Sequence, residues 1–246
     1  MSTPGIYKAV TEVIGKHIYT SDVKPLHLDI GAGRGELITE LQKKFVLQSY
    51  ACDYHVERFL LPEVPIRQVD INLGALPYDD DSFDLVTASE VIEHLQDYRH
   101  LIREAHRLLK PGGLFVLTTP NVLNLKSRIR NLICGFADLF GPLPLKVTEV
   151  SSTNSHVSPI PYFYLAHSLL KADFVNLQLM IDRSQRTSNF WMVVLAPFLY
   201  LGWADFMRRE RKLNTITPDN EPLTKNHISR KILTGRTLIM SAQKVL

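Results

Sequence analysis

The sequence has few cysteines and little net charge. Cys52 and Cys134 are the two cysteines among 246 residues. They form no C-x-x-C pair and no disulfide framework, so we expect a reducing, cytoplasmic setting. The formal net charge of +3 is too small to indicate nucleic-acid binding. The first residues lack the basic start and apolar run of a signal peptide, which agrees with a cytoplasmic location.

The sequence also lacks an apolar run as long as a bilayer is thick. Residues 190–203, "FWMVVLAPFLYLGW", are fourteen residues without a charge, whereas a membrane-spanning helix needs about 20. We therefore interpret this stretch as a buried or an interfacial helix and not as a membrane span.

Apolar and turn-forming segments alternate in a strand–helix rhythm up to residue 119. With 45% apolar and 22% charged residues, the chain is typical of one α/β domain covering residues 1–246. Such alternation predicts a parallel sheet with helices on both faces. The rhythm breaks in residues 121–172 and 183–233, which we expect to be helical cap or lid insertions. The expected strands are residues 25–30, 48–53, 65–71, 82–89, 114–120, 173–182 and 236–245.

Three glycines, Gly31, Gly33 and Gly35, follow the first expected strand directly. In open parallel sheets, ligands bind outside the carboxyl ends of the strands, where this loop lies. Glycine permits a tight turn and a close approach of ligand to backbone. The alternative is a turn that only joins strand to helix. A dinucleotide-binding G-x-G-x-x-G motif would need a third glycine at Glu36, so a dehydrogenase is disfavoured.

Acidic residues stand at the ends of three strands. Asp29 precedes the glycine loop, Asp53 ends the second strand, and Asp70 with Ile71 follows the third. An acid in the place of Asp53 can accept hydrogen bonds from both hydroxyls of a ribose. Asp70 can accept from the amine of an adenine whose ring lies against Ile71. Each acid alone reads as a solvated turn residue, but the three together predict a site for a nucleoside-type ligand.

The segments "LHLDIGAGRGE", "ACD", "VDI", "FDLVTASEVIEHL" and "LLKPGGLFVLTTPN" resemble class I S-adenosylmethionine-dependent methyltransferases. The resemblance is to the methyltransferase type 11 branch, which includes the ubiquinone-type O-methyltransferases. It covers residues 24–121 and the final two strands. It implies a doubly wound, mostly parallel, seven-stranded Rossmann-like sheet whose last strand is antiparallel.

The resemblance also implies a cofactor, S-adenosylmethionine, and the residues that bind it. The loop of Gly31, Ala32, Gly33 and Gly35 would approach its methionine part, with Asp29 supporting the ammonium group. The remaining contacts would come from Asp53 and Tyr54 at the ribose and adenosine, Asp70 and Ile71 at the adenine, and Ser89 and Glu90 along the other side. The reaction would be an in-line methyl transfer in which the protein aligns the reactants and excludes water.

A second group of polar residues follows the fourth strand, in "SEVIEHL". If this segment is helical, Glu90, Glu93 and His94 share one face at i, i+3 and i+4. Two carboxylates and an imidazole can bind a divalent ion such as Mg²⁺. The pattern resembles the metal motif of ubiquinone-pathway and small-RNA 2′-O-methyltransferases, and His156 would supply the further ligand. In the metal-free alternative, His94 or His156 is the general base, or His156 is merely a loop histidine.

The insertions would select the acceptor. Residues 121–172 and 183–233 supply aromatic, small and basic side chains that would form an apolar lid over the carboxyl edge of the sheet. We therefore expect O-methylation of a small or lipid-like acceptor. The basic end of residues 190–212, with Arg208, Arg209, Arg211 and Lys212, would allow peripheral association with the inner face of a membrane. A solvated basic face and a buried helix are the alternatives.

Two other functions stay open at this point. RNA or other N-methylation would predict a strong basic patch or an added RNA-binding module, and the sequence has neither. The other alternative is a catalytically silent protein that binds only the cofactor or only a partner. The intact glycines and acids argue against loss of the cofactor, and the retained Glu90, Glu93 and His94 argue more weakly for chemistry.

Overall fold

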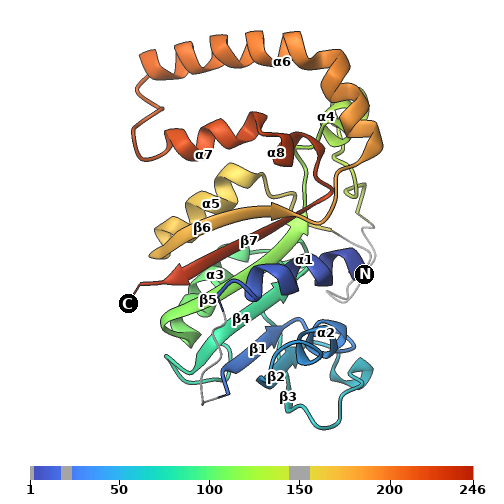
Figure 1. The fold of residues 1–246 in the computed structure, drawn as a ribbon, viewed down its shortest axis with the longest axis vertical. Coiled ribbons are helices and arrows are strands. Elements are labelled where there is room, and N and C mark those ends of the chain that lie inside the picture. The colour runs from blue at the N-terminus through green and yellow to red at the C-terminus, as the bar shows by residue number, and fades with distance from the viewer. Residues whose placement is uncertain (1–2, 18–23, 144–155, 246) are drawn as a thin grey trace.

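The computed structural model describes residues 3–17, 24–143 and 156–245. Its centre is a seven-stranded sheet with the order β3-β2-β1-β4-β5-β7-β6 (Figure 1). Strands β1 to β5 are parallel, and β7 is antiparallel to both β5 and β6. The predicted sheet, including its antiparallel last strand, is confirmed. The strands are β1 (Leu26–Ile30), β2 (Gln48–Asp53), β3 (Ile66–Gln68), β4 (Phe83–Ser89), β5 (Leu109–Pro120), β6 (Phe174–Ile181) and β7 (Thr237–Lys244).

Helices cover both faces of this sheet because its central strands are apolar on both sides. Successive side chains of a strand point to opposite faces: Val116 packs in a cluster with α1 and α2, and Leu117 packs in a cluster with α3 and α5. Both side chains are 1% exposed. The four helices are α1 (Pro4–Ile14), α2 (Glu36–Gln42), α3 (Tyr98–Leu108) and α5 (Tyr162–Lys171).

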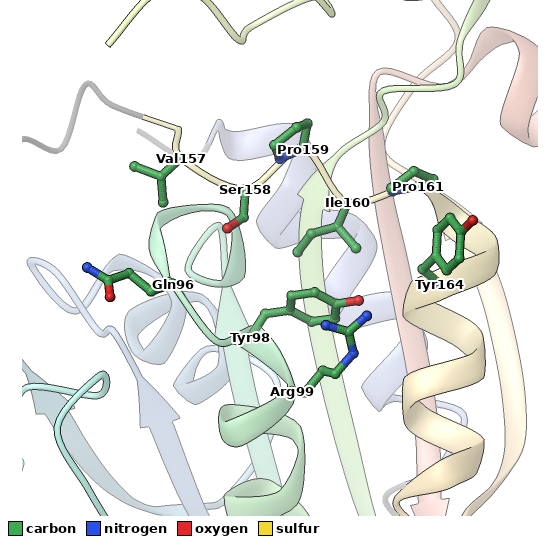
Figure 2. A pocket seen from close by; sticks show the side chains of 9 residues that line it. All are labelled: Gln96, Tyr98, Arg99, Val157, Ser158, Pro159, Ile160, Pro161 and Tyr164. Carbon is green, nitrogen blue, oxygen red and sulfur yellow. The ribbon is translucent and has the colours of Figure 1, made fainter. Parts of the chain in front are cut away.

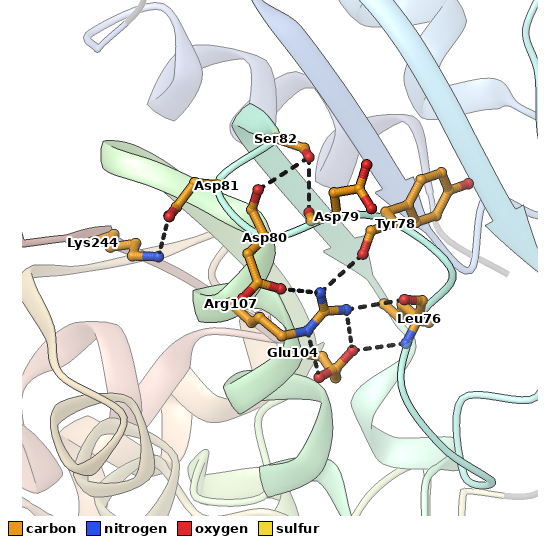
Figure 3. A network of polar contacts seen from close by, with 9 residues as sticks. All are labelled: Leu76, Tyr78, Asp79, Asp80, Asp81, Ser82, Glu104, Arg107 and Lys244. Atoms are coloured by element: carbon orange, nitrogen blue, oxygen red, sulfur yellow. Dashed lines mark hydrogen bonds and ion pairs between the residues drawn. The ribbon is translucent and has the colours of Figure 1, made fainter.

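A polar network holds α3 against the turn that leads into β4 (Figure 3). The Arg107 guanidinium donates to Glu104, to Asp80 Oδ1 at 2.6 Å, and to the carbonyl oxygens of Leu76 and Tyr78. Glu104 accepts in turn from the Leu76 backbone N–H at 2.7 Å. The network lies at the amino end of β4, opposite the edge where a ligand is expected.

The two predicted insertions contain further helices and 3-10 turns. We expected residues 183–233, which contain α6, to form part of a lid over the carboxyl edge of the sheet; α6 itself does not lie over the glycine loop at that edge (Figure 1). It begins beside α4 and runs outside β6, at the far side of the sheet from β1 to β3 (Figure 1). It packs on α4, α8 and η3. The elements concerned are α4 (Leu125–Cys134), α6 (Arg186–Lys212), α7 (Glu221–Lys225), η3 (Asn226–Ile228) and α8 (Arg230–Thr234), while η1 (Val56–Arg58) and η2 (Ile92–His94) lie outside the insertions.

Candidate active site at the carboxyl edge of the sheet

The glycine loop joins β1 to α2 with three residues in the left-handed region. Gly31, Gly33 and Gly35 have φ of 69°, 57° and 88°, where side chains other than glycine are strained. A Cβ at Gly31 would collide with the side chain of Val91. A Cβ at Gly33 would meet no atom within 4 Å. The loop is therefore closed by packing at Gly31 and open to a ligand at Gly33.

Asp53 links the end of β2 to this loop. One carboxylate oxygen accepts from the Gly33 N–H at 2.8 Å, and the other accepts from the His55 N–H at 2.8 Å. The next residue, Tyr54, is 44% exposed. Each carboxylate oxygen has a second lone pair, so Asp53 can hold the loop and still accept from a ligand.

Asp29 is buried beside the loop, and the partners of its side chain were not predicted from the sequence. It accepts from Thr87 Oγ1 at 2.6 Å, and Thr87 also contacts Nε2 of the buried His27 at 2.9 Å. Burial raises the pKa of Asp29 to about 7; the hydrogen bond from Thr87 acts against this shift, and the charge of Asp53 adds to it. A buried acid of this kind becomes a stable anion when a cation comes close.

Asp70 and Ile71 stand in the turn after β3, as the sequence predicted. Asp70 Oδ1 accepts from the backbone N–H of Asn72 at 2.9 Å. Ile71 is partly buried and packs against the main apolar cluster. Because β2 and β3 are parallel neighbours, Asp70 and Asp53 lie at the same edge of the sheet.

The segment after β4 is not the helical turn that we expected. Glu90 has φ of 56°, in the left-handed region, and only Ile92–His94 form a single 3-10 turn. Glu90 is held instead by β5: its N–H donates to the Thr118 carbonyl oxygen at 3.2 Å, and Thr118 Oγ1 donates to its carboxylate at 3.2 Å. Thr118 Oγ1 also lies 3.2 Å from Ser89 Oγ. Glu90 thus does not share a helical face with Glu93 and His94, and that expectation was wrong.

Glu93, His94 and His156 do come together. Each offers one ligand atom, and these three atoms lie within 4.8 Å of one another. The His94 and His156 rings meet edge to face with centroids 4.9 Å apart. The downstream segment is fixed here because the Glu93 carbonyl oxygen accepts from the Val157 and Ser158 N–H groups, both at 2.9 Å. The predicted approach of His156 is confirmed, whereas Glu90 is not part of this group.

The electrostatics of this group favour a cation. Glu93 is fully buried, and neither of its carboxylate oxygens has a hydrogen-bond partner among the described residues. Burial and the nearby charge of Glu90 raise the pKa of Glu93 well above its usual range. Burial and the charge of His94 lower the pKa of His156, so this imidazole is neutral near pH 7. Burial likewise raises the pKa of Glu90 to about 7, although the Thr118 hydrogen bond acts against it.

Two residues at this edge were missed in the sequence. The Asp182 side chain follows β6, is fully buried and accepts from the Thr237 N–H at 2.9 Å. Arg236 precedes β7, and its charge lowers the pKa of Glu90, whereas the charge of Asp182 raises it. The rule that ligands bind beyond strand ends could have found both, because β6 and β7 were predicted correctly.

A shallow groove of about 400 Å³ lies on the outer side of the segment that carries His156 (Figure 2). Tyr98 and Arg99 of α3 form one wall, and Ser158, Ile160 and Tyr164 form the other. Ser158 Oγ donates to the Leu95 carbonyl oxygen at 2.6 Å, which closes the groove toward the Glu93 group. None of the predicted cofactor residues lines it.

Comparison with known proteins gives one family. Residues 28–117 match the family model described as a methyltransferase domain. A probable S-adenosylmethionine-dependent methyltransferase of Mycolicibacterium smegmatis is 39% identical over 38% of this chain and 37% of its own length. The mitochondrial arginine-hydroxylase NDUFAF5 of Mus musculus is 32% identical over 37% of this chain and 28% of its own length. The chain thus spans about a third of the length of these two curated relatives.

Longer matches agree with this result. The demethylmenaquinone methyltransferase of Corynebacterium efficiens is 32% identical over 60% of this chain and 62% of its own length. In fold, the chain is similar to a solved S-adenosylmethionine-dependent methyltransferase of Archaeoglobus fulgidus, with a TM-score of 0.57, 19% identity, and coverage of 97% of this chain and 94% of that one. Residues 28–117 thus match a methyltransferase domain, and the fold of the chain is similar to that of solved S-adenosylmethionine-dependent methyltransferases.

Proposed function

We propose that this protein transfers the methyl group of S-adenosylmethionine to an oxygen of a lipid-like or other hydrophobic acceptor. The observation that carries the proposal is Asp53, which binds the Gly33 N–H at the open side of the glycine loop. This arrangement stands at the carboxyl edge of the sheet, inside the segment matched by the methyltransferase family.

The residues at the loop fit this cofactor. The space at Gly33 that a Cβ would occupy is open, so a ligand can lie against the backbone. Asp29 is a buried acid whose pKa of about 7 would fall beside an ammonium group. Asp53 and Asp70 would serve as acceptors for a nucleoside, and Ile71 would serve as its apolar contact. When bound, S-adenosylmethionine supplies a methyl group on a positively charged sulfur, which is already activated for displacement.

The residues beyond β4 would handle the acceptor. A hydroxyl loses its proton as it becomes methylated, so a base is needed within reach. His156 is held neutral by burial and by the charge of His94, and its Nδ1 has no hydrogen-bond partner among the described residues. We assign His156 or His94 to this role in the metal-free form of the reaction.

Glu93, His94 and His156 would instead hold a divalent cation if one is resident. The unpartnered, fully buried carboxylate of Glu93 supports this assignment. An ion with bonds of about 2.0–2.2 Å holds its ligands about 3–4 Å apart, so a separation within 4.8 Å needs only a small contraction. Two imidazoles and one carboxylate suit Mn²⁺, Fe²⁺ or Zn²⁺ better than Mg²⁺, which prefers oxygen ligands. The ion would lower the pKa of a bound hydroxyl.

Calorimetric titration with S-adenosylmethionine, with and without Mn²⁺ or a chelator, tests the proposal. We expect micromolar binding of cofactor under all conditions, and turnover that falls with chelation if the metal is resident. Glu93→Gln would remove metal binding, whereas Glu40→Gln, an exposed carboxylate on α2, would not. No cofactor binding under any condition would refute the proposed activity and favour a partner-binding role. Full turnover after exhaustive chelation would contradict a resident metal and would support a histidine as the general base.

The acceptor class has its own test. The protein is incubated with methyl-labelled cofactor and with hydroxylated lipids or hydroquinones, and the organic phase is counted. Label that stays in the organic phase after mild alkali excludes a methyl ester, and its release as methyl iodide by hydriodic acid identifies an ether and supports O-methylation of this class. Label recovered only in RNA or in polar amines would refute it and support the N-methyltransferase alternative.

A further inference from the structure

The α6 helix is apolar around its whole circumference and yet lies on the surface. Phe198 and Leu201 are both 73% exposed, and Val193 is 74% exposed. Of its described residues, only Ser188 and Met207 are buried. A helix that is apolar all round normally lies in a protein core or in lipid. Of the two alternatives that the sequence left open, a buried or an interfacial helix, the buried one is wrong, and this surface needs another apolar environment.

The residue types along α6 match a lipid interface from end to end. Residues 187–204 are eighteen residues without a charge, a helical length of about 27 Å. Trp191 and Trp203 stand toward the two ends of a mostly aliphatic segment that also contains Phe198 and Tyr200, and tryptophan at both ends is typical of helices whose ends meet lipid headgroups. By length and composition, α6 is the one helix in the described part of the chain that could cross a membrane.

Charge at the two ends of α6 favours an anionic surface. Residues 183–212 contain six basic and two acidic residues, a net charge of +4. Arg208 and Arg209 both pair with the single carboxylate of Asp205, so positive charge remains beside them. The neighbouring helix α4 packs on α6 and exposes two more apolar side chains, Leu132 at 86% and Ile133 at 78%. Exposed apolar groups with basic flanks are the features that bind anionic bilayers.

The connections of α6 decide how it can meet a bilayer. Near its first turn, Ser188 Oγ accepts from the Lys126 N–H at 3.2 Å, and near its last turn Arg211 pairs with Glu221 at 2.6 Å. The strands before and after it, β6 and β7, are neighbours in the sheet. Both ends of α6 are thus fixed to one globular body and must stay on one side of a membrane. A spanning arrangement would carry one end to the other side.

We propose that α6 lies in the headgroup region of an anionic lipid bilayer, parallel to its surface, and holds the protein on that membrane. Phe190, Val193, Phe198 and Leu201 enter the lipid, and the basic residues at both ends meet anionic headgroups. Because α6 begins at the carboxyl edge of the sheet (Figure 1), the bilayer would lie near the active site. This last consequence rests on the proposed function; the attachment itself does not.

The chain contains its own probe for this contact. Its two tryptophans, Trp191 and Trp203, both lie on α6, with Trp203 stacked on His227 of η3, so selectively excited tryptophan fluorescence reports on this helix alone. We expect vesicles of phosphatidylcholine with phosphatidylglycerol to shift the emission to the blue and to sediment the protein. Binding to phosphatidylcholine alone should be weaker by on the order of tenfold or more, because the basic ends gain nothing there. High salt should narrow this difference.

Two matched variants separate lipid contact from folding. Leu201→Glu places a carboxylate on the exposed face of α6 and should weaken vesicle binding by on the order of tenfold to a hundredfold. Val46→Glu makes the same kind of change at a side chain that is 70% exposed between α2 and β2 and should leave binding unchanged. Both variants should bind S-adenosylmethionine as the wild type does.

Three results would overturn the proposal. One is the absence of a fluorescence shift with either vesicle. Another is a stable dimer in sedimentation velocity that Leu201→Glu dissociates, which would assign the surface to a second copy of the chain. The third is stronger quenching of the tryptophans by deep than by shallow brominated lipids, which would indicate deep insertion. Cofactor binding in the same preparation shows whether the proposed methyltransferase function survives such a failure.

Discussion

Asp53 offers a sharp test of the cofactor site because each of its two oxygens already has a backbone partner. The carboxylate accepts from the Gly33 N–H and from the His55 N–H, both at 2.8 Å. Asp53→Asn keeps the shape of the side chain but replaces one acceptor oxygen with an NH₂ donor. One of the two backbone N–H groups then faces another donor.

The expected loss of cofactor affinity follows from the hydrogen bonds that change. A hydrogen bond to a charged acceptor contributes about 1.5–3 kcal/mol, against about 1 kcal/mol for a neutral one. In the proposed complex, the variant loses the charged acceptor for two ribose hydroxyls and also loosens the loop at Gly33. We expect a loss of about 3 kcal/mol in cofactor binding, which corresponds to on the order of a hundredfold in Kd.

Calorimetry with S-adenosylmethionine measures this change, and Asp84→Asn is the control. Asp84 accepts from the Leu26 N–H at 2.8 Å and pairs with Lys110 at 2.9 Å, but it stands at the amino edge of the sheet. Its substitution should lower the melting temperature and leave the Kd unchanged. If Asp53→Asn bound the cofactor within threefold of the wild type, the assignment of Asp53 to the ribose would be wrong.

Three other outcomes are expected. Gly31→Ala should abolish cofactor binding because its Cβ collides with Val91 at a φ of 69°, whereas Gly135→Ala, at a φ of 76° in open space, should only cost stability. Asp29 has a pKa of about 7 when folded, so the unfolded chain releases this proton first and stability falls as pH rises from about 4 to about 7. Asp29→Asn should reduce this fall, to which Glu90 and Glu93 also contribute through their raised pKa values, and should melt at a higher temperature at pH 8; an unchanged pH profile would contradict the shift. Arg107→Met should lower the free energy of unfolding, measured in urea, by about 2–3 kcal/mol without changing the Kd for the cofactor. A higher Kd would contradict the prediction that this polar network is independent of the cofactor site.

The strands were predictable from sequence, although β3 is shorter than predicted and β5 begins earlier, at Leu109. Alternating or continuous apolar runs bounded by turn residues set β2 as residues 48–53, as predicted, and the acids at the strand ends followed from the topology. The closing pair β6 and β7 was also predicted, because each is a run of apolar residues after a turn. These features are local in the chain, so local patterns suffice to locate them.

The features that could not be predicted depend on contacts between segments that are distant in the sequence. Glu90 adopts a left-handed backbone because β5 binds both its N–H and its carboxylate through Thr118, and helical spacing contains no trace of that. The exposure of α6 could not be predicted either, since the sequence of an apolar helix is the same whether the helix lies in a core or on a surface. The partners of Asp29 come from neighbouring strands and become visible only when the sheet is assembled.

The place of β7 has a consequence for how the protein is made. β7 follows β6 in the chain but lies between β5 and β6 in the sheet. During synthesis, β5 keeps an unpaired edge and β6 has no place to dock until residues 237–244 leave the ribosome. Throughout that interval the apolar α6 has emerged without the strand that later fixes its neighbourhood. A nascent chain of this protein is therefore most prone to aggregation, and most in need of a chaperone or a membrane, while α6 has emerged from the ribosome and residues 237–244 have not.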